Sequence, residues 1–157
     1  SRLLQMEVQP NTISTGILAV LAQRLVRMIC PICKEEYKPD PEQSRGYERI
    51  LPRTTRYYRG RGCSACSHTG YRGRKPVTEL WTPNNDERWL INKEASDVEI
   101  RARALANGTV PLVKDGLMMV HEGITTIDEI IRVLPYEEIG GEDMQLEGQN
   151  IADFIEV

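Results

Sequence analysis

The motifs Cys30-Pro31-Ile32-Cys33 and Cys63-Ser64-Ala65-Cys66 contain all four cysteines of this 157-residue sequence. Each CxxC motif presents two thiolates from one tight turn, and together they supply the four sulfur ligands that structural zinc prefers. Four sulfur ligands leave no coordination position for water, so the pattern predicts a structural and not a catalytic metal site. We therefore predict that one zinc ion is bound by four residues: Cys30, Cys33, Cys63 and Cys66.

Two other uses of the cysteines stay open at this point. A disulfide-rich small domain is usually shorter than this chain and denser in cysteine. A redox-active dithiol usually has a single CxxC motif beside a βαβ unit, and this sequence predicts no βαβ unit. His68, two residues after Cys66, is an alternative ligand, but four thiolates complete the site without it. Metal binding by the four thiolates is therefore the favoured interpretation.

Charge is distributed unevenly along the chain. Nine basic residues and one acid, Glu48, lie between Arg45 and Lys75, whereas residues 136–157 contain seven acids and no lysine or arginine. The net charge is −3, and the sequence without that tail has 20 basic residues against 16 acidic ones, a net charge of +4. The mean charge therefore conceals a basic middle and an acidic tail.

The basic middle supports an alternative function, a zinc-ribbon module that binds nucleic acid. Phosphate contacts by arginine and base stacking on aromatic rings are the interactions that such a module needs. The acidic tail opposes binding of a polyanion, so no nucleic-acid partner is expected. The tyrosines available for stacking are Tyr47, Tyr57, Tyr58 and Tyr71.

The hydrophobic pattern predicts a mainly α fold with a small zinc-stabilised β subdomain. A helix is expected over residues 13–29, because the apolar residues Ile17, Leu18, Leu21, Leu25 and Met28 follow helical spacing. Proline at position 31 would end it. Short strands are expected over residues 56–59 and 77–81.

The C-terminal half reads as a series of short helices. Thr126 and Glu129 are expected to form a capping box, and Trp89 and Leu90 are expected to face inward. His121 is expected near the C-terminal end of a helix, where a histidine side chain interacts favourably with the helix dipole. The predicted helices cover residues 41–50, 86–92, 97–106, 112–122 and 127–133, with a short terminal helix around 151–155.

Catalytic motifs are missing from the sequence. It contains no GxxxxGK[ST] phosphate loop, no GxGxxG, no HExxH and no GxSxG motif. No apolar run approaches the roughly 20 residues that a membrane-spanning helix requires. The sequence alone therefore predicts no catalytic residue.

The residues around the cysteines are more specific than the CxxC motifs themselves. The stretch Ala22-Gln23-Arg24-Leu25-Val26-Arg27 precedes the first motif, and Gly62-Cys63-Ser64-Ala65-Cys66-Ser67-His68-Thr69-Gly70-Tyr71-Arg72-Gly73-Arg74 surrounds the second. With Glu79-Leu80, Asp115-Gly116-Leu117 and Gly123-Ile124-Thr125-Thr126, they resemble the C-terminal part of the ATPases of bacterial type II secretion and type IV pilus assembly. The resemblance covers about residues 2–134.

The resemblance implies a fragment of a hexameric, RecA-like ATPase that is cytoplasmic and peripheral to the inner membrane. The four cysteines match the family's metal ligands. Arg74 matches an arginine expected near nucleotide in the intact protein, where a guanidinium can pair with phosphate. ATP and magnesium would be bound only by the intact protein, because the phosphate loop is absent here. The fragment alone is expected to be inactive.

The resemblance also implies a division of the chain and a set of partners. The implied partners are neighbouring ATPase subunits and an inner-membrane platform protein. The expected parts are a lead-in and helix from the end of the motor core (residues 1–29), a zinc-binding subdomain with a basic loop (30–75), a C-terminal helical region (76–134) and an acidic, flexible tail (135–157).

Overall fold

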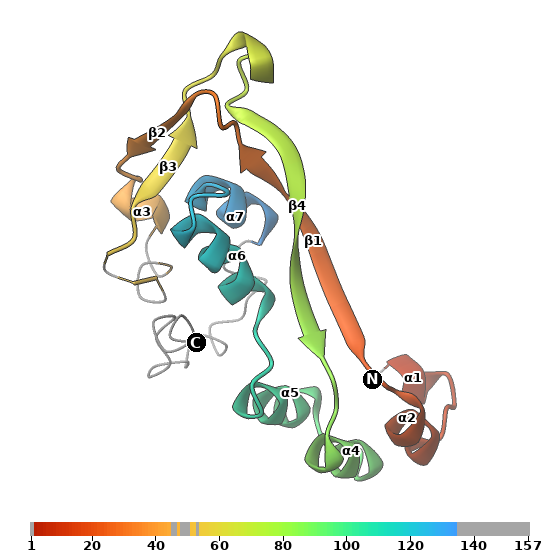
Figure 1. The fold of residues 1–157 in the computed structure, drawn as a ribbon. Helices are drawn as coiled ribbons and strands as arrows, with labels where there is room; N and C mark the ends of the chain where they lie inside the picture. Colours follow the sequence, from red (N-terminus) through yellow and green to blue (C-terminus); the bar gives the residue numbers. More distant parts are fainter. Residues whose placement is uncertain (1, 45–46, 48–50, 53, 135–157) are drawn as a thin grey trace. The chain divides into compact units, whose positions relative to one another are not determined.

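The computed structural model describes residues 2–44, 47, 51–52 and 54–134. The predicted terminal helix at 151–155 lies outside these residues. Within them, the fold is mixed: short helices accompany two small sheets (Figure 1). The elements are α1 (Arg2–Gln5), α2 (Pro10–Gly16), β1 (Val20–Ile29), β2 (Lys34–Tyr37), α3 (Pro41–Ser44), β3 (Tyr57–Gly60), the 3-10 helix η2 (Ser64–Cys66), β4 (Tyr71–Trp81), α4 (Asn85–Asn92), α5 (Asp97–Ala106), α6 (Leu112–His121) and α7 (Ile127–Val133).

The chain divides into two compact units. Unit 1 comprises residues 1–22 and 78–111, and unit 2 comprises residues 23–77 and 112–157. In unit 1, Arg88 of α4 donates hydrogen bonds to the carbonyl oxygens of Ser14 and Ile17, and so ties α4 to α2. No helix among the described residues is long and apolar enough to cross a membrane.

The predicted helix over residues 13–29 is wrong. The helix α2 ends at Gly16, and residues 20–29 form strand β1, which pairs with β4. The apolar residues at positions 20, 21, 25, 26 and 29 do not by themselves separate a helix from a strand, so the strand with which this segment pairs decides its conformation. Leu18 is 81% exposed and Leu21 is 58% exposed, so the predicted stripe is not a buried helix face.

Most other elements agree with the sequence pattern. The helices α5 and α7 have the predicted bounds, and α6 ends one residue early, at His121. The two predicted strands correspond to β3 and to the end of the longer β4. Trp89, expected inside, is 59% exposed, whereas Glu87 and Ile91 of the same helix are buried.

The buried face of α4 follows from its capping. Asn84 accepts hydrogen bonds from the amides of Asp86 and Glu87, which fixes the start of the helix. Glu87 then accepts hydrogen bonds from the Asn84 amide at 2.7 Å and from the Asn107 side chain at 3.0 Å. These donors let a carboxylate occupy the face that the sequence pattern assigned to Trp89.

The core of unit 2 packs α6 and α7 against the paired strands. Val26 of β1 and Val77 of β4 are fully buried with Leu117 and Ile130. A methyl group added at Gly116 would lie 2.9 Å from Ile130 Cδ1, so glycine permits this close approach of α6 and α7. The Asp-Gly-Leu stretch of the sequence thus has a packing explanation.

Candidate metal centre

Two turns and one hairpin bring the four cysteines together. Cys30 directly follows β1, and Cys33 directly precedes β2. The antiparallel pairing of β2 with β3 places Lys34 opposite Gly60, and the Cys33 carbonyl oxygen accepts a hydrogen bond from the Arg61 amide at 2.9 Å. This pairing brings the second motif, around η2, next to the first.

The four sulfur atoms lie close enough together to hold one metal ion. All four Sγ atoms lie within 4.8 Å of one another. The Sγ–Sγ distance is 3.9 Å for Cys30–Cys63, 3.9 Å for Cys33–Cys66 and 3.7 Å for Cys63–Cys66. A tetrahedron of sulfurs about 2.3 Å from zinc has edges of about 3.8 Å. None of the three pairs approaches the bond length of roughly 2.05 Å that a disulfide requires.

Backbone amides point at the sulfur atoms. The amides of Gly62, Cys63 and Gly70 lie 3.2–3.3 Å from Cys33 Sγ or Cys66 Sγ. Hydrogen bonds from the Cys63 and Gly70 amides lower the pKa of Cys66 to about 6, whereas burial raises the pKa of Cys33 to about 11. Amide donors stabilise thiolates and orient metal ligands, so the surroundings suit a metal-bound tetrathiolate.

Two glycines beside the four cysteines, Gly60 and Gly70, pack directly against each other. A methyl group added at Gly60 would lie 2.0 Å from the Gly70 carbonyl oxygen, a backbone atom that cannot move aside. Gly70 has a φ of 78°, in the left-handed region that favours glycine. The Cys30 amide donates to the same Gly70 oxygen at 2.9 Å, so this contact positions a ligand.

Gly60→Ala is therefore expected to lower the free energy of unfolding by about 3 kcal/mol or more, through overpacking against backbone. The loss is measurable by urea denaturation. Gly16→Ala is the matched control, because nothing lies within 4 Å of its added methyl group and its φ is not positive. Equal effects of the two substitutions would contradict the close packing of Gly60 on Gly70.

The structure does not add either histidine to the cluster. The group of four possible metal ligands contains cysteines alone, and His68 contributes a backbone hydrogen bond to the Cys63 carbonyl oxygen at 2.9 Å. His121 Nδ1 lies 3.0 Å from the Thr55 hydroxyl oxygen. Arg74 is exposed on β4, and its nucleotide role stays a prediction.

A buried carboxylate in unit 2 was missed by the sequence reasoning. Glu129 is fully buried and accepts hydrogen bonds from the Arg27 amide, the Arg27 guanidinium and the Arg132 guanidinium, at 2.6–3.0 Å. Arg27 also stacks 4.0 Å above the ring of Tyr71, whose hydroxyl lies 2.8 Å from Thr126 Oγ1. This arginine–glutamate cluster joins β1, β4 and α7.

Half of the predicted capping box is present. The Thr126 hydroxyl accepts a hydrogen bond from the Glu129 amide at 3.0 Å, as expected. The Glu129 side chain serves the two arginines instead of the start of the helix. The sequence pattern assigned Glu129 to the helix cap, so its hydrogen bonds with the distant Arg27 were not predicted.

A lysine connects the metal-site hairpin to the helices of unit 2. Lys34 Nζ donates to the Gly123 carbonyl oxygen at 2.7 Å and lies 4.3 Å above the Tyr58 ring. At the end of β2, the Tyr37 hydroxyl donates a hydrogen bond to the Asp128 carboxylate at 3.1 Å. The hairpin is therefore fixed by polar contacts to the α6–α7 turn and to the first turn of α7.

The tyrosines proposed for base stacking are already engaged. Tyr47 is 2% exposed and donates to the Leu134 carbonyl oxygen at 3.2 Å. Tyr57 packs against the core of unit 2, and Lys34 and Arg27 cover the rings of Tyr58 and Tyr71. Stacking on nucleic-acid bases needs a free ring face, so this arrangement disfavours the nucleic-acid alternative.

The fold and the site together define a mixed α/β chain with a tetracysteine cluster that can hold a metal ion. The chain belongs to the type II/IV secretion system protein family, whose model matches residues 1–132.

Curated relatives agree with this assignment. The chain is 40% identical to the type II secretion system ATPase E of Vibrio cholerae over 134 residues, which is 85% of this chain and 26% of that protein. It is 40% identical over 136 residues to the type II secretion system protein E of Pseudomonas aeruginosa, covering 85% and 26%. It is 41% identical over 133 residues to the type IV pilus assembly ATPase PilB of Thermus thermophilus, covering 83% and 15%. The chain thus spans about a quarter or less of these relatives.

Proposed function

We propose that this chain is the C-terminal, zinc-containing region of an ATPase that powers type II secretion or type IV pilus assembly. The observation that carries the proposal is the tetrahedral spacing of the four sulfur atoms within a chain of this family. Zinc would be held by Cys30, Cys33, Cys63 and Cys66 as a closed structural site. The parent protein would be a cytoplasmic hexamer at the inner membrane, and ATP and magnesium would bind to its other parts.

Zinc would hold the shape of a hairpin that lacks a core of its own. The buried residues clustered around the site are the cysteines themselves. In this proposal, the hairpin presents a shaped, arginine-rich surface to a neighbouring subunit or to the membrane platform protein. Arg74 on β4 would approach nucleotide bound elsewhere in the assembly.

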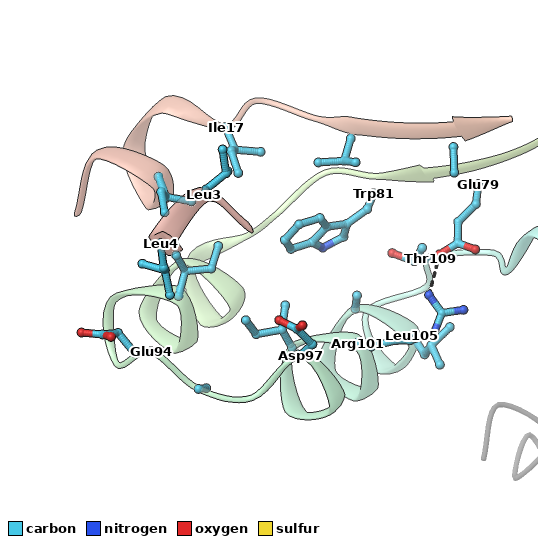
Figure 2. A pocket seen from close by; sticks show the side chains of 17 residues that line it. Leu3, Leu4, Ile17, Glu79, Trp81, Glu94, Asp97, Arg101, Leu105 and Thr109 are labelled. Atoms are coloured by element: carbon cyan, nitrogen blue, oxygen red, sulfur yellow. Dashed lines mark hydrogen bonds and ion pairs between the residues drawn. The ribbon is translucent and has the colours of Figure 1, made fainter. Parts of the chain in front are cut away.

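Unit 1 contains an apolar cleft that supports its membership in a larger motor core. The cleft has a volume of about 470 Å³ and is lined by apolar side chains that include Leu3, Ile17 and Trp81, with the Glu79–Arg101 ion pair at 2.9 Å along one side (Figure 2). Leu18, Leu21 and Leu80 are also more than half exposed. Apolar surface of this kind marks an interaction site. We propose that the remainder of the longer ATPase covers it, as the fourfold greater length of two relatives allows.

The test uses the full-length protein that contains this chain. Cys33→Ser with Cys66→Ser is expected to remove one zinc per subunit and to lower both the hexamer fraction and ATP hydrolysis several-fold, because the hairpin loses its shape. Metal content, light scattering and phosphate release measure these quantities. Ser64→Ala with Ser67→Ala, in the same loop, is the control. Full assembly and hydrolysis after verified zinc loss would overturn the proposal.

A further inference from the structure

Three exposed arginines of unit 2 have no side-chain partner within the described part of the chain. Arg61 follows β3, and Arg72 and Arg74 lie near the start of β4. All three are exposed, and their side chains form no hydrogen bond or ion pair with the residues that the structure describes. Arg59, by contrast, is paired with Glu35 at 3.0 Å. We name Arg61, Arg72 and Arg74 the basic face.

The contact between Gly60 and Gly70 brings the segment that carries Arg61 next to the segment that carries Arg72 and Arg74. The backbones of Gly60 and Gly70 are in direct contact, since a methyl group at Gly60 would meet Gly70 at 2.0 Å. Arg61 is one residue after the first glycine, and Arg72 is two residues after the second. Residues 56–75 contain six lysines and arginines and no acid. Like charges gathered in this way repel one another, and a polyanionic segment would relieve the repulsion.

The same chain supplies a segment of matching charge. Residues 135–157 contain seven acids and no basic residue. The match to the family model ends at residue 132, so this tail is not part of what defines the family. Its acids are spread over the whole segment, which allows several simultaneous contacts with arginine guanidinium groups.

The tail can reach the basic face within one molecule. Tyr71, next to Arg72, contacts Thr126 at the start of α7 with 2.8 Å between their side-chain oxygens. Helix α7 has seven residues and is therefore about 10 Å long. The following 23 residues span up to about 75 Å when extended, far more than the distance needed. Tethering raises the effective concentration of such a segment to the millimolar range.

We propose that the acidic tail, residues 135–157, binds the basic face of its own chain and shields it from other anionic partners. Contacts between exposed charges are screened by salt, with a Debye length of about 30 Å at 0.01 M and about 8 Å at 0.15 M ionic strength. The tail therefore acts as a competitor that an anionic partner or added salt displaces.

The experiment compares four variants of the full chain with its metal content verified: a tail variant, a face variant, a combination of these two and a control. The tail variant replaces five tail acids by their amides, the face variant carries Arg61→Gln, Arg72→Gln and Arg74→Gln, and a control neutralises five exposed acids elsewhere. The tail positions are Glu137, Glu138, Glu142, Asp143 and Glu147, and the control positions are Glu7, Glu36, Glu42, Glu94 and Glu122.

Two measurements decide the outcome. Backbone amide NMR signals of residues 61–74 are expected to shift in the tail variant at about 0.01 M salt and to converge with the wild type at about 0.15 M. A heparin oligosaccharide is expected to bind the tail variant about tenfold more tightly than the wild type, if the tail covers nine-tenths of the molecules. The face variant with the neutral tail should lose this gain.

The control separates docking from net charge. Equal gains in heparin affinity for the control and the tail variant would overturn the proposal, because a general charge effect would then explain both. Unshifted amide signals would overturn it as well. If the tail-dependent shifts appear only as the protein concentration rises, the contact forms between two copies of the chain. The intramolecular proposal would then be wrong.

Discussion

Cys66→Ser is expected to abolish metal binding and to unfold the hairpin of β2 and β3 while α4 and α5 stay folded. Structural zinc contributes about 10 kcal/mol or more to folding in small zinc-binding peptides. Here, 29 residues separate the two CxxC motifs, and the cluster buried around the site consists of cysteines. Tyr47 and Leu51 of the intervening loop pack in the core of unit 2, but the residues beside the two motifs have no such burial to offset the entropy of ordering them without the metal.

Metal analysis and hydrogen exchange measure this result. The wild type is expected to hold one zinc per chain, and the variant close to none. Amides of residues 33–37 and 57–66 should lose protection, whereas those of 97–106 keep it because α5 lies in unit 1. A strong chelator added to the wild type should reproduce the same pattern.

Ser64→Ala is the matched control for Cys66→Ser. Ser64 is exposed and belongs to the same short helix, η2, but it offers no thiolate. It should retain metal and protection. Protection of the hairpin that survives verified metal loss would contradict the view that the metal replaces a hydrophobic core.

The four-cysteine cluster could be predicted because its signal is local. Each CxxC motif fixes two ligands within four residues, and two motifs complete a tetrahedral set whatever the intervening fold. Gly62, Gly70 and Gly73 beside the second motif all have positive φ, a conformation that favours glycine. The close contact between Gly60 and Gly70 could not be predicted, because it depends on the pairing of β2 with β3.

The strand β1 could not be separated from a helix by its own residues. Ala22, Gln23, Arg24 and Leu25 favour helices intrinsically, and their apolar neighbours fit either period. Pairing with β4, which lies more than forty residues later, decides the conformation. Helices α5 and α7 were predictable because Ser96 and Thr126 cap them locally.

Glu129→Ala is expected to lower the free energy of unfolding by about 2–3 kcal/mol, a large effect for a single residue that is not a metal ligand. The side chain is fully buried, and its removal leaves the Arg27 amide and two guanidinium groups without their acceptor. The arginine side chains are 41% and 58% exposed, so water recovers part of the loss. Urea denaturation measures the change.

The pH dependence gives a second, more specific readout. Burial raises the pKa of Glu129, but hydrogen bonds from Arg132 and Arg27 outweigh it and lower the pKa to about 2 from 4.5. A carboxyl group with a lowered folded-state pKa stabilises the fold above its unfolded pKa. This stability is fully present above about pH 4.5 and is lost as the pH falls through about 2.

Glu129→Gln tests the charge apart from the volume. It keeps the side-chain shape, so it should cost less than alanine at neutral pH, and it should lose part of the decline in stability between about pH 4.5 and 2. Asp128→Asn is the control, since Asp128 is exposed on the same helix turn and receives one hydrogen bond, from Tyr37. If Glu129→Gln keeps the full acid dependence of the wild type, the carboxylate is not the charged centre of the arginine–glutamate cluster. The cluster would then be held by packing, and the links between β1, β4 and α7 would not depend on the charge of Glu129.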